Sequence, residues 1–195
     1  MPKRSAWSSN AAAAMAEGRH RVALSLGSNL DAAVHLPAAI AALRERFTVL
    51  AESPVYRNQA VGFAGADFFN SAVIIDCDLE PLALHAWLHA LEAAHGRRRD
   101  QPRFSDRPLD IDIVLFDDLV LSGPGPLQIP RAELQYAFVL KPLVDIAADW
   151  ALPEGGPTLA QLWAVHAERG DPRWSARAQC GGSAVADGEA PLASR

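Results

Sequence analysis

The sequence has little cysteine, no strong excess of one charge and no long apolar run. It contains two cysteines, Cys77 and Cys180, which are too few for a disulfide framework and fit a reducing cytoplasm. The formal net charge of −5 argues against a general affinity for nucleic acid. No apolar run reaches membrane-spanning length, so we expect no membrane partner. Residues 1–19 also lack the continuous apolar stretch of a signal peptide.

The remaining composition is that of an ordinary globular protein. Half of the 195 residues are hydrophobic and 21% are charged, which is enough apolar material for one core. Residues 1–19 and 169–195 are rich in small residues without periodicity, so we expect a disordered leader and a disordered tail. These limits leave a single domain over residues 20–168.

Hydrophobic periodicity predicts an alternation of strands and helices in this domain. The expected strands are 21–26, 48–56, 68–76 and 109–116, with brief strands at 119–121 and 127–129. The first expected helix begins near His35, and the second begins at Pro81 and stops at Gly96. Two more short helices are expected at 139–147 and 159–167. The order strand–helix–strand–strand–helix–strand predicts an α+β sandwich, an antiparallel sheet with helices packed on one face.

The most informative stretch runs from Arg97 to Phe116. Its first part is a loop with five arginines and two prolines, which is too polar to be core. Its second part is a short apolar run that carries Asp110 and Asp112. In a strand these two carboxylates project from the same face, where they repel each other unless a cation lies between them or one of them keeps its proton. Paired carboxylates beside guanidinium groups suit a polyphosphate bound with Mg²⁺. The alternatives are a solvated arginine surface and an ordinary strand end.

Two further patterns leave alternatives open. His85, His89 and Glu92 share one face of the second helix and could bind zinc, although a solvated helix edge is the better interpretation of the histidines. Asn70 is preceded by phenylalanines, and an amide flanked by aromatic rings can bind a flat heterocycle. The alternative is that these rings belong to the core. Small sheets with aromatic residues and arginines also bind RNA, and the paired aspartates argue against that function.

In their order and spacing, these motifs resemble the 6-hydroxymethyl-7,8-dihydropterin pyrophosphokinase family of the folate pathway. The resemblance runs from about Val22 to about Leu162. Its strongest motif is Arg107-Pro108-Leu109-Asp110-Ile111-Asp112-Ile113. The other motifs are Leu26-Gly27-Ser28-Asn29-Leu30, Ser53-Pro54-Val55-Tyr56-Arg57, Asp67-Phe68-Phe69-Asn70-Ser71-Ala72-Val73, Glu92 with Gly96-Arg97, Phe138-Val139-Leu140 and Pro142-Leu143.

The resemblance implies a ferredoxin-like fold and transfer of diphosphate from ATP to the hydroxymethyl group of the pterin, releasing AMP. It implies that Asp110 and Asp112 hold two Mg²⁺ ions. The partners would be pterin and ATP, without nucleic acid, and the protein would be a monomer or weak dimer. The residues expected at the triphosphate and nucleotide are Glu92, Arg97, Arg99, Arg107 and Arg131. The residues expected at the pterin are Asn58, Val61, Phe68, Asn70 and Phe138.

The chain departs from the family's pattern at several positions. Asn58-Gln59-Ala60 follows Tyr56-Arg57 where the family has Thr-Pro-Pro, and Phe104 matches a tryptophan. Arg131 matches a histidine near the adenine, and Tyr136 matches an arginine. Because most departures fall on the nucleotide side, we expect pterin recognition to be retained and ATP binding to be weaker or differently selective. A paralogue that acts on a related pterin or alcohol is the alternative function.

Overall fold

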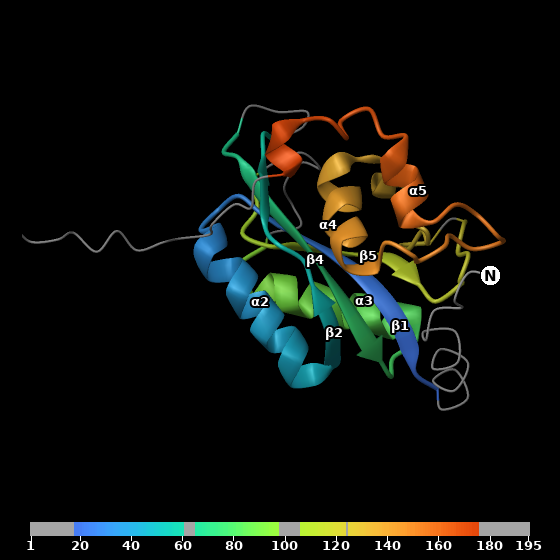
Figure 1. Cartoon of the computed structure of the whole chain (residues 1–195). Coiled ribbons are helices and arrows are strands. Elements are labelled where there is room, and N and C mark those ends of the chain that lie inside the picture. Colours follow the sequence, from blue (N-terminus) through green and yellow to red (C-terminus); the bar gives the residue numbers. More distant parts are fainter. Residues whose placement is uncertain (1–17, 61–64, 98–105, 124, 176–195) are drawn as a thin grey trace, which may run out of the picture.

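The structure is a computed structural model that describes residues 18–60, 65–97, 106–123 and 125–175. Five strands form one sheet, and helices lie against it (Figure 1). The strands are β1 (His20–Ser28), β2 (Thr48–Glu52), β3 (Tyr56–Asn58), β4 (Phe68–Cys77) and β5 (Asp110–Phe116). The helices are α2 (Ala32–Arg46), α3 (Pro81–Ala94), α4 (Ala137–Ala147) and α5 (Leu159–Ala164), with 3₁₀ turns η1 (Ala132–Gln135) and η2 (Pro172–Trp174). The predicted α+β class is confirmed.

The sheet is antiparallel, and β1 lies at its centre. The strand order is β2-β4-β1-β5, and β3 also pairs with β4, beyond the end of β2. Residues of β1 therefore have neighbours on both sides, and Gly27 pairs with Asn70 of β4 and with Asp110 of β5. Three polar or small positions that are far apart in sequence thus become adjacent at one end of the sheet.

Helices cover both faces of the sheet, not one face as the sequence order suggested. Side chains alternate along β1, so Leu24 joins the core beneath α2 and α3 while Ala23 joins the core beneath α4 and α5. Figure 1 shows α2 and α3 on one side of the sheet and α4 and α5 on the other. The sequence predicts α4 as a short helix but does not indicate which face of the sheet it covers. In the structure, Leu140 and Leu143 of α4 are buried in the second core.

Two element boundaries also differ from the predictions. The first helix begins at Ala32 and not near His35, so Pro37 lies inside it. The expected strand 48–56 is divided into β2 and β3 around Ser53 and Pro54. At Ser53 the regular backbone pairing with β4 is interrupted. The Ala72 amide donates a hydrogen bond to the side-chain Oγ of Ser53 at 2.8 Å, and not to a backbone carbonyl. Pro54 offers no amide donor for continued pairing.

The remaining differences lie toward the carboxyl end of the chain. The expected strands at 119–121 and 127–129 are reduced to a single bridge between Leu121 and Ile129. The last predicted helix ends at Ala164. Ordered structure continues past residue 168, where the tail was expected to start, because Trp174 of η2 is buried. Among the described residues, none of the helices combines the length and apolarity required to cross a membrane.

Candidate active site

Three strands contribute side chains to the same face at one end of the sheet. Asp110 and Asp112 alternate with Ile111 and Ile113, which are buried in the core beneath α2 and α3. The two carboxylates therefore emerge on the opposite face, as the sequence predicted. The register places Gly27 between Asp110 and Asn70. This end of the sheet combines two carboxylates with the buried side-chain amide of Asn70.

Arginines from both flanks of the expected arginine loop reach Asp110. Nη1 of Arg97 donates to Asp110 and to Glu92, and Nη1 of Arg107 donates to the second oxygen of Asp110. Glu92 is fully buried, and its Oε1 also accepts from the amide of Ile111 at 2.8 Å. Although burial opposes the change, the carboxylates of Asp110 and Glu92 raise the pKa of Arg97. Glu92 therefore fixes the guanidinium of Arg97 against the first residue of β5.

A third arginine holds the second carboxylate. The Arg131 amide donates to the carbonyl of Val114 at 3.0 Å, which places the residue along the edge of β5. Its Nη2 lies 2.8 Å from Asp112 Oδ1. Burial and the neighbouring charge of Asp110 raise the pKa of Asp112 to about 7, although about 32% of its side chain is exposed. A cation bound beside Asp112 would therefore favour the ionised form of its carboxylate.

The described residues expected at the pterin are two side-chain amides and two aromatic rings. Asn58 and Asn70 are both buried, and Nδ2 of Asn70 donates to Oδ1 of Asn58. Gly27 leaves room for this pair, since a Cβ atom there would lie 3.0 Å from Asn70 Oδ1 and 3.8 Å from a ring carbon of Phe68. Phe138 lies at the start of α4, where its ring stacks on Tyr136 with 5.2 Å between centroids.

Asn29 has a structural role that the sequence analysis missed. Its Oδ1 accepts from the Arg107 amide at 2.7 Å, and its Nδ2 donates to Asp106 at 2.5 Å and to the carbonyl of Ala66 at 3.3 Å. One buried side chain thus joins the ends of the two loops that flank the site. Asn29 belongs to the motif Leu26-Gly27-Ser28-Asn29-Leu30 of the resemblance, but its partners lie far away in the sequence, so no local pattern reveals this role.

The zinc site considered for His85, His89 and Glu92 receives no support from the contacts of Glu92. Its carboxylate binds Arg97 and the amide of Ile111. The rings of His85 and His89 contact each other, with centroids 3.7 Å apart. Within the described ranges, no group of three metal-ligating side chains is found. Of the expected site residues, Val61 and Arg99 lie outside the described residues, as do Arg98 and Phe104.

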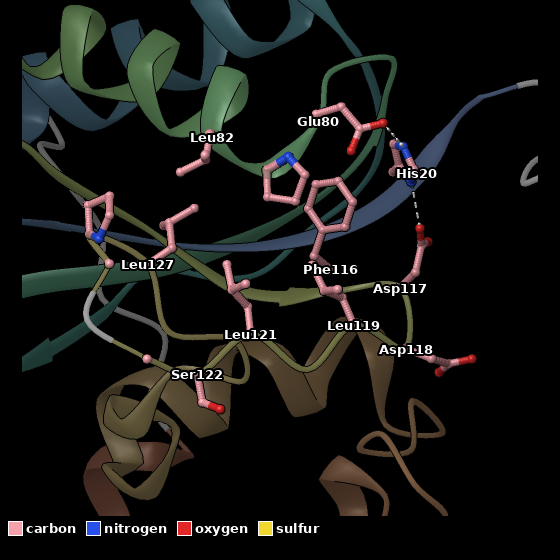
Figure 2. A pocket seen from close by; sticks show the side chains of 14 residues that line it. His20, Glu80, Leu82, Phe116, Asp117, Asp118, Leu119, Leu121, Ser122 and Leu127 are labelled. Atoms are coloured by element: carbon pink, nitrogen blue, oxygen red, sulfur yellow. Dashed lines mark hydrogen bonds and ion pairs between the residues drawn. The ribbon is translucent and has the colours of Figure 1, made fainter.

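A large cavity of about 830 Å³ lies at the opposite end of β5. It surrounds Phe116 and is lined mainly by apolar side chains of α3 and of the segment that follows β5, such as Leu82, Leu121 and Leu127. Figure 2 shows His20 at the edge of the cavity, between Asp117 and Glu80. The Nδ1 of His20 lies 2.8 Å from Oδ2 of Asp117. None of the expected site residues lines this cavity, so the cavity and the carboxylate site are separate features.

Comparisons with known proteins identify the family of the chain. The family model for 7,8-dihydro-6-hydroxymethylpterin-pyrophosphokinase matches residues 23–148. The chain belongs to this family. The 2-amino-4-hydroxy-6-hydroxymethyldihydropteridine pyrophosphokinase of Pseudomonas aeruginosa is 39% identical over 140 residues, which cover 69% of this chain and 85% of that protein. The protein of the same name from Synechocystis is 35% identical over 147 residues, covering 73% and 74%.

Solved structures of low sequence identity show the same fold. The crystal structure of wild-type Plasmodium falciparum HPPK-DHPS has a TM-score of 0.61 and 12% identity, over 77% of this chain and 45% of that longer chain. The family resemblance read from the sequence is confirmed, and so is the expectation of an enzyme. As a pyrophosphokinase, this member of the family is a diphosphotransferase of folate biosynthesis.

Proposed function

We propose that the enzyme transfers the β,γ-diphosphate of ATP to the hydroxymethyl group of 6-hydroxymethyl-7,8-dihydropterin, with Mg²⁺, at the end of the sheet that carries Asp110 and Asn70. The observation that carries this proposal is the register of β1. Gly27 pairs with Asn70 on one side and Asp110 on the other, so a group that recognises a heterocycle adjoins the group that recognises a metal-bound polyphosphate.

The pterin half of the proposal rests on the amide pair. A pterin edge presents donors and acceptors in one plane, and a buried side-chain amide offers both. Asn70 is held by Asn58, which restricts the rotation of its amide. Phe68 and Phe138 supply the aromatic faces for stacking. Val61, the remaining residue expected at the pterin, belongs to the proposal on the resemblance alone.

The phosphate half rests on three guanidinium groups. Arg97, Arg107 and Arg131 all lie against the two aspartates. A guanidinium carries five N–H donors in a fixed plane, which matches phosphate oxygens in pairs. Glu92 acts here by orienting Arg97. The fourth arginine, Arg99, is included on the resemblance alone.

The donor set fits Mg²⁺. Asp110 and Asp112 are hard oxygen ligands on one face of one strand, and the charge of Asp110 contributes to the raised pKa of Asp112, which is the behaviour of a carboxylate pair suited to a cation. Two bound Mg²⁺ ions would neutralise phosphate charge and template the reacting oxygens. The count of two follows from the resemblance.

The reaction needs positioning more than covalent chemistry from the protein. The pterin hydroxyl oxygen forms a bond to the β-phosphorus of ATP as the bond from that phosphorus to the α,β-bridging oxygen breaks, and AMP leaves. Asn70 and the aromatic residues fix the hydroxymethyl group, while the arginines hold the triphosphate in line. We assign no side chain as the base for the hydroxyl proton.

Most departures from the family's pattern fall on the nucleotide side. The exception is Asn58-Gln59-Ala60, whose first residue is expected at the pterin. Arg131 pairs with Asp112 at 2.8 Å, so a permanent positive charge stands where the resemblance implies a histidine. We therefore propose that ATP binding, and not pterin binding, differs from that of other members.

We also propose that the enzyme works in the cytoplasm as a monomer or weak dimer. We expect no nucleic-acid partner, in keeping with the net charge of −5.

The direct test is an assay of AMP release from ATP, with and without the dihydropterin and with Mg²⁺ or EDTA. We expect AMP only when pterin and Mg²⁺ are both present. Calorimetric titration with a pterin analogue, and separately with a non-hydrolysable ATP, would show which side has diverged. The absence of pterin binding together with tight nucleotide binding would favour the paralogue with another alcohol substrate.

A further inference from the structure

The carboxyl-terminal turn η2 lies outside residues 23–148, which the family model matches, yet it carries a buried aromatic side chain. Trp174 is 3% exposed. The turn that presents it is set locally by its own sequence: Asp171 accepts from the Arg173 amide at 2.9 Å, and Pro172 occupies the first position. An ordered turn that buries a tryptophan is the pattern of a segment with a packing partner.

The partner of Trp174 is the strand that carries Asn58. Trp174 packs with Tyr56 and Ala137 in one buried cluster, with Phe138 and Trp163 at its border. The ring centroids of Trp174 and Tyr56 are 5.8 Å apart, and those of Trp174 and Trp163 are 6.3 Å apart at 87°. These distances are typical of aromatic pairs that contribute beyond simple area burial.

Tyr56 is itself fixed at its hydroxyl end. The hydroxyl donates to Asp145 at 2.6 Å, and Lys141 donates to the same hydroxyl at 3.1 Å. Burial and the hydrogen bond to Asp145 raise the pKa of Tyr56, so the phenol stays protonated and remains the donor. α4 therefore holds the hydroxyl of Tyr56, and Trp174 packs against its ring.

Two steps connect this cluster to the pterin side of the site. Tyr56 pairs with Asn70 in the β3–β4 ladder, and Asn58, two residues further along β3, accepts the hydrogen bond from the Asn70 side chain. Phe138 borders the same cluster at the start of α4. Displacement of the Tyr56 ring would therefore move both the strand that orients Asn70 and an expected stacking residue.

We propose that Trp174 is a positioning residue for pterin recognition: it packs β3 and the start of α4 together, so that Asn58, Asn70 and Phe138 keep the geometry that reads the pterin. The proposal rests on the proposed function for the roles of Asn70 and Phe138. Trp174 acts through these groups and is not assigned a contact with substrate. The carboxyl-terminal segment thus becomes part of the specificity of the enzyme.

The indole nitrogen gives a conservative variant for the test. Among the described residues, the Nε1 of Trp174 has no hydrogen-bond partner, so its contribution is apolar packing, which a phenylalanine largely preserves. We expect Trp174→Phe to keep the KM for pterin within about threefold of wild type. Trp174→Ala removes the ring, and we expect the KM for pterin to rise about tenfold or more while kcat and the KM for ATP stay within about twofold.

A matched control separates positioning from general loss of stability. Trp87 on α3 is partly buried against the core on the other face of the sheet, where it packs edge-on against Phe47 with ring centroids 5.0 Å apart. Trp87→Ala should lower the melting temperature as Trp174→Ala does, without a specific change in the KM for pterin. The kinetic measurements would be made well below the melting temperature of every variant.

A second readout does not depend on turnover. The side-chain amide resonances of Asn70, observed in ¹⁵N-labelled full-length protein, should shift in Trp174→Ala and stay in place in Trp87→Ala. If wild type is active and Trp174→Ala changes all kinetic constants equally, or no more than Trp87→Ala does, the proposal is wrong. If wild type shows no pterin turnover, the proposed function is wrong, and the Asn70 resonances alone test the positioning role of Trp174. A shift in Trp174→Ala but not in Trp87→Ala supports that role, and the absence of such a shift overturns it.

Discussion

A Cβ atom on Gly27 would lie 3.0 Å from Oδ1 of Asn70, closer than most side-chain contacts in proteins allow. Gly27 is the residue of the central strand that faces Asn70 on one side and Asp110 on the other. The position therefore needs glycine because of a close approach, and its backbone conformation is ordinary for a strand. The approach joins the proposed pterin half of the site to the proposed metal half.

The first prediction concerns this contact. Gly27→Ala should displace the Asn70 amide by a few tenths of an ångström and weaken binding of a pterin analogue about tenfold or more, as measured by calorimetry. Gly125→Ala is the matched control, because no described atom lies within 4 Å of a Cβ built there. Equal affinities for wild type and Gly27→Ala would show that the geometry of Asn70 does not control pterin binding.

The second prediction concerns the carboxylate pair. Asp112→Asn removes one anionic ligand while Asp110 keeps its ion pairs with Arg97 and Arg107. We expect kcat to fall about 10²–10³-fold, with pterin affinity largely retained. Asp118→Asn changes an exposed aspartate beyond the other end of β5 and should be silent. Turnover of Asp112→Asn within about threefold of wild type would contradict the metal assignment.

The third prediction compares two arginines of different setting. Arg107→Ala removes a mostly buried, charge-assisted contact with Asp110. It should raise the activation free energy that corresponds to kcat/KM for ATP by about 2–4 kcal/mol. Arg44 forms an exposed ion pair with Glu52 at 2.7 Å, and exposed pairs contribute little. Arg44→Ala should therefore leave the kinetics unchanged. Similar losses in both variants would indicate a nonspecific effect of positive charge.

The fourth prediction follows from the raised pKa of Asp112, about 7 against an ordinary 3.8. Between these values the folded, metal-free protein binds more protons than the unfolded chain, so the free energy of unfolding falls as pH rises through this window. Asp112→Asn removes this dependence. In EDTA, the free energy of unfolding of Asp112→Asn relative to wild type should increase from pH 4.5 to pH 8, as measured by urea titration. A difference that stays constant or decreases would mean that Asp112 is ionised throughout.

The sequence predicted the parts of the site that lie within one short segment. Asp110 and Asp112 share a face because strand periodicity is local. Arg97 and Arg107, which contact Asp110, belong to the arginine-rich stretch that precedes the two aspartates. Gly27, Asn29 and Trp174 were not assigned their roles, because each acts through contacts with residues far away in the chain. The division between β2 and β3 was missed because it depends on a hydrogen bond from Ala72 to the side chain of Ser53.

The most direct test of the central claim is the identity of the products. Wild-type enzyme would be incubated with ATP, Mg²⁺ and 6-hydroxymethyl-7,8-dihydropterin, and the mixture resolved by ³¹P NMR, with Asp112→Asn in parallel. We expect AMP and a pterin diphosphate in equal amounts from wild type, and in the same time at most about one hundredth of either product from the variant. ADP with a pterin monophosphate, or AMP with free pyrophosphate and unmodified pterin, would contradict it.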